Sequence, residues 1–196
     1  MILVHHPNRR STEKEVLCKR VLAELGPDYA PSYVVFDYAE YSDSPSCLDE
    51  LRDIAFTWNP GDVILTEPYY LRELMAQTEC AGIIWLSVRA LDFPSQLFAW
   101  IVAHEARHIF QFRKNPSYST NRIQVGALRR KPEFIGMSPL LFGLGELDSE
   151  ISALRALRKL YGTEVSQEFM AQTELPRGPF PIYNQFLTEA ESQWVE

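Results

Sequence analysis

The feature that most constrains the fold is the stretch AWIVAHEARHIFQFRK, residues 99–114, in which an apolar run carries His104, Glu105 and His108. The apolar residues recur at helical spacing and predict a helix over residues 93–113. A helix this apolar is expected to be buried, where two imidazoles and a carboxylate cost free energy unless they have partners. The sequence therefore predicts that a partner inside the protein compensates the free-energy cost of burying these three side chains.

The spacing of the three residues indicates a metal site. His104 and His108 are four residues apart, so on a helix they lie on one face, within reach of a single ion. Glu105 lies about 100° around the helix, where it can contact a water at that ion without displacing either imidazole. This HExxH pattern is typical of zinc enzymes in which the glutamate is the general base. We therefore expect His104 and His108 to bind Zn²⁺ and Glu105 to be catalytic.

A catalytic zinc site has three protein ligands, so the two histidines need a further partner. His5 and His6 are adjacent at the end of a predicted strand and point opposite ways, so at most one of them can face the site. A stronger candidate is the stretch GELDSEISALRAL, residues 145–157. Here the chain resembles the gluzincin metallopeptidases, in which a glutamate on a second helix completes the HExxH site. The resemblance extends over residues 91–156.

This resemblance implies a role for each glutamate of ELDSE, residues 146–150. Glu146 is the implied third zinc ligand, and Glu150 is the carboxylate that bonds a ligand imidazole and fixes its tautomer. The two glutamates are four residues apart on one helix face, so the reverse assignment remains open. Asp148, two positions from each, is expected to face elsewhere, at the surface. The implied activity is the hydrolysis of peptide bonds in a protein or peptide substrate.

Metallopeptidases of this kind usually add a side-chain donor for the developing oxyanion. Tyr118, Arg122 and Arg107 lie close enough to HExxH in sequence to be candidates for oxyanion or substrate contacts, and no feature distinguishes them. The three residues therefore remain candidates.

The charge distribution near the motif is uneven. The net charge is −7, yet residues 107–131 contain seven basic residues and no acidic one. They are Arg107, Arg113, Lys114, Arg122, Arg129, Arg130 and Lys131. Three interpretations remain open: recognition of an acidic substrate or a peptide C-terminal carboxylate, docking on nucleic acid, and a solvated basic loop. The second would make the role similar to that of the SprT- and Spartan-type proteases, although those complete their site with a third histidine and none follows His108.

Apolar runs that alternate with helical patterns predict an α+β fold of one domain. Residues 1–90 are expected to form strand–helix repeats and a mixed sheet, residues 91–174 the helices of a zincin-like metal site, and residues 175–196 a linker and a last helix. The expected strands are residues 2–6, 32–38, 62–67 and 82–88. The expected helices are residues 11–26, 46–58, 67–79, 93–113, 144–161 and 163–173, with Ser11 or Thr12 and Asp92 as N-terminal caps and a long loop over residues 115–140.

The strand GIIWLSV, residues 82–88, has two interpretations. It is either the sheet edge along which zincins bind an extended substrate, or a buried central strand. The sequence favours neither.

Other features limit the classes of function. The N-terminus is too short in apolar residues for a signal peptide, and no run approaches the roughly 18 that span a bilayer, so a cytoplasmic protein without a membrane partner is expected. Three widely spaced cysteines, Cys18, Cys47 and Cys80, argue against a disulfide framework or a cysteine zinc cluster. Two alternatives remain: a module of the same fold that holds zinc or a peptide without cleaving it, and a metal-dependent deformylase or amidase, whose glycine-rich cysteine motif is missing.

Overall fold

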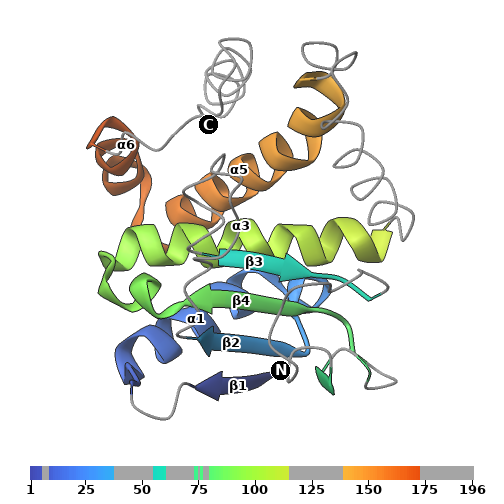
Figure 1. Cartoon of the computed structure of the whole chain (residues 1–196). Coiled ribbons are helices and arrows are strands. Elements are labelled where there is room, and N and C mark those ends of the chain that lie inside the picture. Colours follow the sequence, from blue (N-terminus) through green and yellow to red (C-terminus); the bar gives the residue numbers. More distant parts are fainter. Residues whose placement is uncertain are drawn as a thin grey trace, which may run out of the picture.

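The computed structural model describes residues 1–5, 9–37, 55–60, 73–74, 76, 80–114 and 139–172. Its elements, with η for a short 3₁₀ helix, are in chain order β1 (Ile2–His5), α1 (Thr12–Leu25), η1 (Pro27–Tyr29), β2 (Tyr33–Asp37), β3 (Ala55–Trp58), β4 (Ile83–Ser87), η2 (Val88–Asp92), α3 (Ser95–Lys114), α5 (Pro139–Tyr161) and α6 (Thr163–Gln172) (Figure 1). A mixed sheet with helices agrees with the predicted α+β class. Within these ranges, no helix combines the length and the apolar character needed to cross a bilayer.

The described strands form one sheet in the order β1-β2-β4-β3. β1, β2 and β4 are parallel, and β3 pairs antiparallel with β4. The parallel strands β1 and β2 are joined through α1, as a crossover connection requires. β4 therefore lies between β2 and β3, and all five of its residues are buried. Of the two interpretations of GIIWLSV, the buried central strand is confirmed.

Both faces of the sheet are covered, and alternate residues divide between them. Toward the helices, Val34 and Phe36 of β2 and Ile84 and Leu86 of β4 form one core cluster with α1 and α3. The buried residues of the other face are Tyr33, Val35, Trp58, Ile83 and Trp85. Burial on both faces explains why these strands are continuous apolar runs in the sequence.

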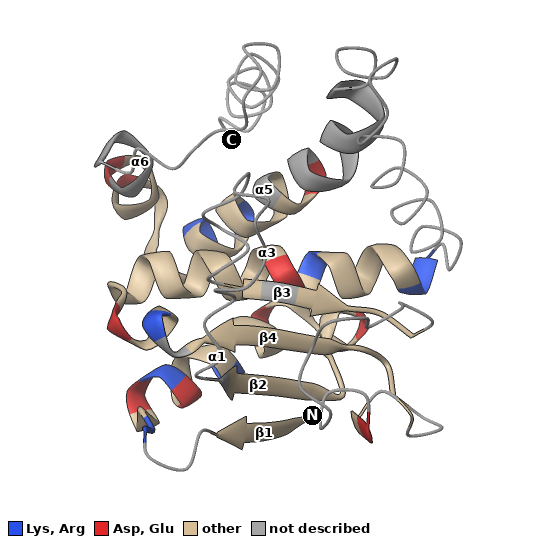
Figure 2. Ribbon diagram, in the orientation of Figure 1, with Lys and Arg blue, Asp and Glu red and all other residues tan. Residues whose placement is uncertain are grey.

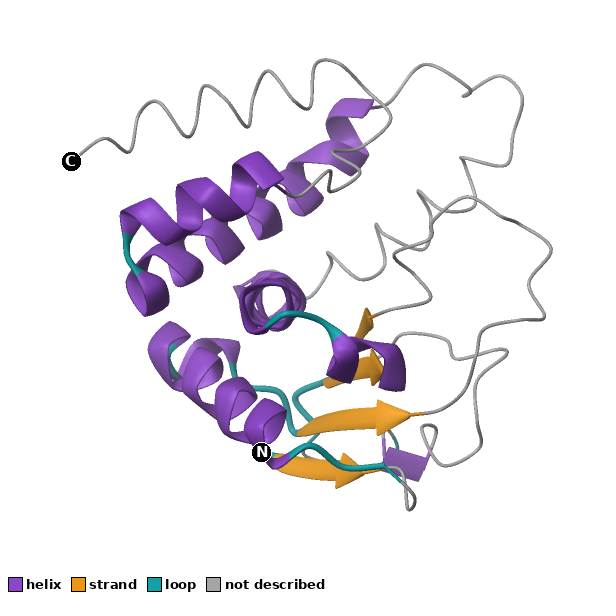
Figure 3. Cartoon of the chain, turned by 90° about the vertical axis from the view of Figure 1, so that its left-hand side faces the viewer, coloured by secondary structure: helices purple, strands orange, loops and turns teal. Residues whose placement is uncertain are grey.

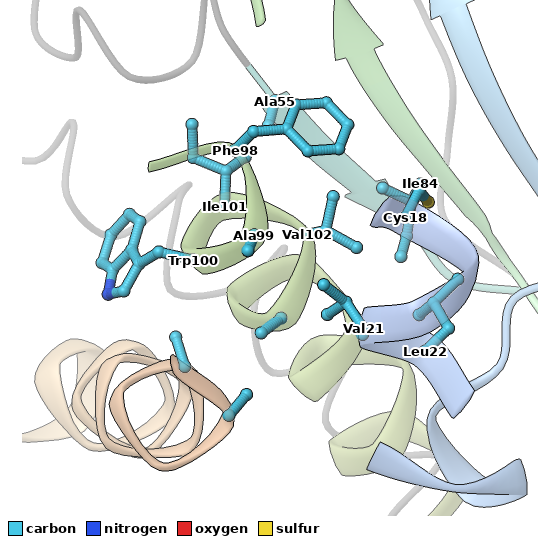
Figure 4. Close-up of a cluster of buried hydrophobic side chains, with 14 of the residues drawn as sticks. Cys18, Val21, Leu22, Ala55, Ile84, Phe98, Ala99, Trp100, Ile101 and Val102 are labelled. Atoms are coloured by element: carbon cyan, nitrogen blue, oxygen red, sulfur yellow. The ribbon is translucent and has the colours of Figure 1, made fainter. Parts of the chain in front are cut away.

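α3 is the central helix of the described structure. Figure 3 shows it end-on between the sheet and the layer formed by α5 and α6. Its apolar side chains reach three neighbours: Figure 4 shows Val102 beside α1, Phe98 beside β3 and Trp100 directed toward α5. Ten of its 20 residues are buried, among them Glu105 and His108. The prediction that the HExxH helix is buried and central is confirmed.

Several predicted boundaries are confirmed. Three of the expected strands are β1, β2 and β4, and the expected helix over residues 163–173 is α6. α1 begins after Ser11, whose Oγ accepts a hydrogen bond from the Lys14 backbone N–H at 3.3 Å, and it ends at Gly26. Local capping chemistry was therefore enough to define this helix.

The helix predicted for residues 46–58 is wrong at its end, because Ala55–Trp58 form β3. Thr57 faces α3 while Trp58 joins the cluster on the other face, as strand geometry requires. These residues form a strand because they pair with β4, about 25 residues later in the chain. Nothing in the local sequence indicates that pairing.

Two helices begin at other residues than predicted. α3 begins at Ser95, and the carbonyl of Pro94 accepts the Phe98 N–H at 3.0 Å. The predicted cap, Asp92, instead ends η2 and pairs with Arg9. α5 begins at Pro139, before the predicted start at residue 144.

Several predictions lie outside the described residues. They are the strand over residues 62–67, most of the helix over residues 67–79, all but the last two residues of the loop over residues 115–140, and the C-terminal segment 175–196. Residues 115–138 include the candidate site residues Tyr118 and Arg122.

Gly82, directly before β4, allows the sheet and α3 to approach each other. Its φ is +119°, and a Cβ there would lie 2.5 Å from Ile109 Cδ1 and 2.9 Å from the Trp58 carbonyl oxygen. We expect Gly82→Ala to lower the free energy of unfolding by about 2–4 kcal/mol, because left-handed strain adds to a clash with backbone. Urea unfolding measures the loss.

Gly26→Ala is the matched control. Gly26 also has a positive φ, +96°, but nothing lies within 4 Å of its Cβ position. Only the strain of about 1–2 kcal/mol should remain. Equal losses in the two variants would contradict the packing described at Gly82.

Candidate metal centre

The two histidines of HExxH lie one turn apart on α3. The ring centroids of His104 and His108 are 5.1 Å apart, and the ring planes are nearly perpendicular, at 78°. Two imidazoles that share a tetrahedral zinc ion through bonds of about 2 Å have centroids roughly 5 Å apart. The observed spacing therefore fits two ligands of one ion.

The surroundings of the two imidazoles differ. His108 is 1% exposed, whereas His104 is only partly buried and packs against the Trp100 indole with ring centroids 5.3 Å apart. A zinc site with an open position needs such access from one side. His5 lies elsewhere, at the end of β1, with its Nε2 3.5 Å from Glu15 Oε1.

A chain of hydrogen bonds reaches His108 from α5. Gln111 Nε2 donates to Asp148 Oδ2 of α5 at 2.8 Å, and Gln111 Oε1 lies 2.9 Å from His108 Nδ1. An amide oxygen only accepts, so Nδ1 carries the hydrogen, and in the neutral ring Nε2 then carries the lone pair. An imidazole that binds zinc through Nε2 needs this tautomer. Ser149 Oγ makes a longer contact of 3.4 Å to the same Nδ1.

Glu105, the predicted general base, faces β3. Thr57 Oγ1 lies 2.6 Å from Glu105 Oε2 and 2.9 Å from the Glu105 main-chain oxygen. Thr57 is 1% exposed and Glu105 9%. Because Thr57 is on the sheet face toward α3, its hydroxyl holds the carboxylate against β3.

Sequence reasoning missed Gln111 and Thr57. Gln111 follows His108 by three residues on one helix, so helical spacing alone identifies it as a neighbour of the imidazole. Thr57 gave no such signal. It is 48 residues from Glu105 in the chain, within a stretch whose pattern is helical.

Asp148 faces α3, whereas the sequence predicts that it faces the surface. Arg107 Nε and Nη2 donate to Asp148 Oδ2 and Oδ1 at 2.7 and 2.9 Å, and Arg107 Nη1 donates to the Tyr29 hydroxyl. Partial burial raises the pKa of Asp148, but hydrogen bonds from Arg107 and Gln111 outweigh it and the pKa is lowered. The guanidinium of Arg107, a candidate for oxyanion or substrate contacts, is thus bonded within the chain.

Two further basic residues also bond within the chain. Lys and Arg residues mark the C-terminal part of α3 (Figure 2). Arg113 donates to the main-chain oxygens of Pro27 and Ala30 at 2.6 and 2.8 Å, and Lys114 Nζ pairs with Asp28 at 3.1 Å. These bonds attach the segment around η1 to the end of α3. The other four basic residues of the segment 107–131 lie outside the described residues.

Glu146, the predicted third ligand, and Glu150 both lie on α5, and their side chains are outside the described part of the structure. α5 itself passes beside the site, because Ser149 contacts His108. Residue 146 is about one turn from Ser149, on the same side of the helix. Among the residues that the structure describes, no three His, Cys, Asp or Glu side chains form a group that could hold a metal ion.

Comparisons with known proteins identify no relative. A scan of protein-family models finds no match, and searches of the curated proteins and of the solved structures find no similar protein. The site is therefore interpreted from its own residues.

The Arg107–Asp148 pair should stabilise the protein more than an exposed pair on the same helix. Its side chains are 20% and 41% exposed, against 59% and 57% for Lys114 and Asp28. We expect a double-mutant cycle with Arg107→Met and Asp148→Ala to give a coupling free energy of about 1 kcal/mol, and the cycle with Lys114→Met and Asp28→Ala less than about 0.5 kcal/mol. Urea unfolding gives both values, and equal couplings would contradict the assignment.

Proposed function

We propose that the protein is a zinc-dependent metallopeptidase of the gluzincin type. His104 and His108 of α3 and Glu146 of α5 hold the Zn²⁺, and Glu105 is the general base. The observation that carries the proposal is the geometry of the imidazole pair. The rings are 5.1 Å apart on a buried helix, and the hydrogen bond to Gln111 leaves the lone pair of His108 on Nε2. Both features are what two ligands of one ion require.

Zinc held by these residues would lower the pKa of a water and polarise the scissile carbonyl. The residues of the chain provide the proton transfers. Glu105 takes a proton from the attacking water and returns it to the leaving amine. Thr57 holds the Glu105 carboxylate through the 2.6 Å contact, so the carboxylate keeps one orientation. Burial of Glu105 under β3 limits its access to bulk water.

The order of the elements supports the same proposal. A mixed sheet leads into the HExxH helix α3, and α5, which carries the two glutamates, packs on α3. The gluzincin resemblance leads us to expect a sheet, an HExxH helix and a glutamate helix in this order. Since Gln111 bonds Nδ1 of His108, we assign Glu150 to the other imidazole, His104.

A second candidate is a module of the same fold that holds zinc or binds a peptide without cleaving it, associated with nucleic acid through residues 107–131. The described basic residues of that segment, Arg107, Arg113 and Lys114, all bond within the chain, which reduces the charge available to phosphates. A carboxylate held one position from a ligand also favours catalysis, because a structural zinc site needs no general base.

Glu105→Gln separates the two candidates. The variant removes the proton acceptor and keeps the shape, so cleavage of labelled casein or a mixed peptide library should fall at least about 100-fold. Zinc content, measured by elemental mass spectrometry, should stay at the wild-type level. Glu164→Gln, an exposed change on α6, is the control and should keep full activity. A wild type that holds zinc and cleaves nothing would favour the binding module.

The assignment of the third ligand is tested by zinc affinity, measured in competition with a chromophoric chelator. Glu150→Ala should weaken binding about 10- to 100-fold, as loss of a partner to a ligand imidazole does. Glu146→Ala should weaken it far more, because a ligand is lost. Glu164→Ala should have no effect. Equal losses at residues 146 and 150, or the reverse order, would contradict the assignment.

A further inference from the structure

We infer that Gln111 is a positioning residue: together with Asp148 it holds His108 in the Nδ1–H tautomer, the form whose Nε2 can bind a metal ion. The inference deepens the proposed function and rests on the zinc site described there. It assigns to an amide on α3 the task that the gluzincin resemblance gives to a carboxylate on the second helix.

The orientation of the Gln111 amide follows from its partners. A carboxylate only accepts, so the atom 2.8 Å from Asp148 Oδ2 is the amide nitrogen. The same nitrogen lies 3.3 Å from Ser149 Oγ. Turning the amide over would bring two oxygens together at Asp148 and would place an N–H against His108. The carbonyl oxygen therefore stays directed at Nδ1 of His108.

Asp148 is itself held in place by α3 and, through Arg107, by η1. Arg107 of α3 binds both of its carboxylate oxygens. The guanidinium in turn donates to Tyr29 of η1 and lies 4.2 Å from the centre of the Phe110 ring. A bidentate pair fixes the carboxylate plane as well as its position. A continuous series of hydrogen bonds therefore links η1, through Asp148 of α5, to the His108 imidazole.

This arrangement has a chemical consequence at His108. A neutral imidazole exchanges its hydrogen between the two nitrogens, and only one tautomer presents a lone pair at Nε2. An acceptor that is held from outside selects that tautomer and the ring angle before any ion arrives. We therefore expect Gln111 to raise metal affinity without touching the metal.

The test compares Gln111→Met, which keeps the length of the side chain and removes its hydrogen bonds, with Gln96→Met on the same helix. ¹⁵N NMR of histidine-labelled, zinc-free protein at pH about 8.5, where imidazoles are neutral, reports the tautomer of His108. We expect the Nδ1–H form in wild type and in Gln96→Met, and loss of that preference in Gln111→Met. Zinc affinity should fall about 10- to 100-fold in Gln111→Met and change less than about twofold in Gln96→Met.

A rescue variant separates positioning from simple packing. Gln111→Glu combined with Asp148→Asn conserves charge and leaves an acceptor for Nδ1 of His108, so the tautomer and most of the zinc affinity should return. Should Gln111→Met fail to fold, Asp148→Ala gives the same comparison, because it removes the acceptor that orients the Gln111 amide.

Two results would overturn the inference. One is an unchanged tautomer and affinity in Gln111→Met. The other is an Nε2–H tautomer of His108 in zinc-free wild type. That result would rule out the positioning role, whatever zinc affinity is measured. A wild type with the Nδ1–H tautomer that binds no zinc would instead contradict the proposed function, so the two failures are distinguishable.

Discussion

The contact between α3 and α5 contains a line of polar bonds inside an otherwise apolar interface, and the candidate site depends on it. Arg107 binds Asp148, Asp148 binds Gln111, and Gln111 binds His108. A buried polar group without a partner costs about 1–3 kcal/mol, so each link restricts the next. A shift of α5 by one residue would separate Asp148 from both of its donors. The register of α5, and with it the backbone position of Glu146, is set by these bonds.

The sheet restricts α3 from the other side. Thr57 of β3 contacts Glu105, while the apolar residues of α3 pack on β2, β4 and α1. Glu105 and His108 therefore face different neighbours although they are close in sequence: the carboxylate faces the sheet, and the imidazole faces α5. A helix held from both sides can keep one carboxylate and two imidazoles in fixed relative positions, which the proposed catalysis requires.

The parts of the fold that local chemistry determines were predictable from the sequence. Ser11 and Gly26 mark the ends of α1, and continuous apolar runs mark the strands of the parallel sheet. The HExxH spacing alone placed His104 and His108 on one face of a buried helix. Long-range pairing was not predictable in the same way. The sequence of β3 is typical of the end of a helix, and only its pairing with β4 makes it a strand. The sequence around Asp148 is typical of a surface position, and only the fold brings Arg107 to it.

We propose that one cation binds both imidazoles of α3, the buried His108 and the partly buried His104. The most direct measurement is the zinc content, by elemental mass spectrometry, of protein purified without chelator or added metal, for wild type and for His104→Ala with His108→Ala. We expect about one zinc ion per chain in wild type and essentially none in the double variant, because two of the three proposed ligands are lost. A stably folded wild type that contains no metal would contradict it.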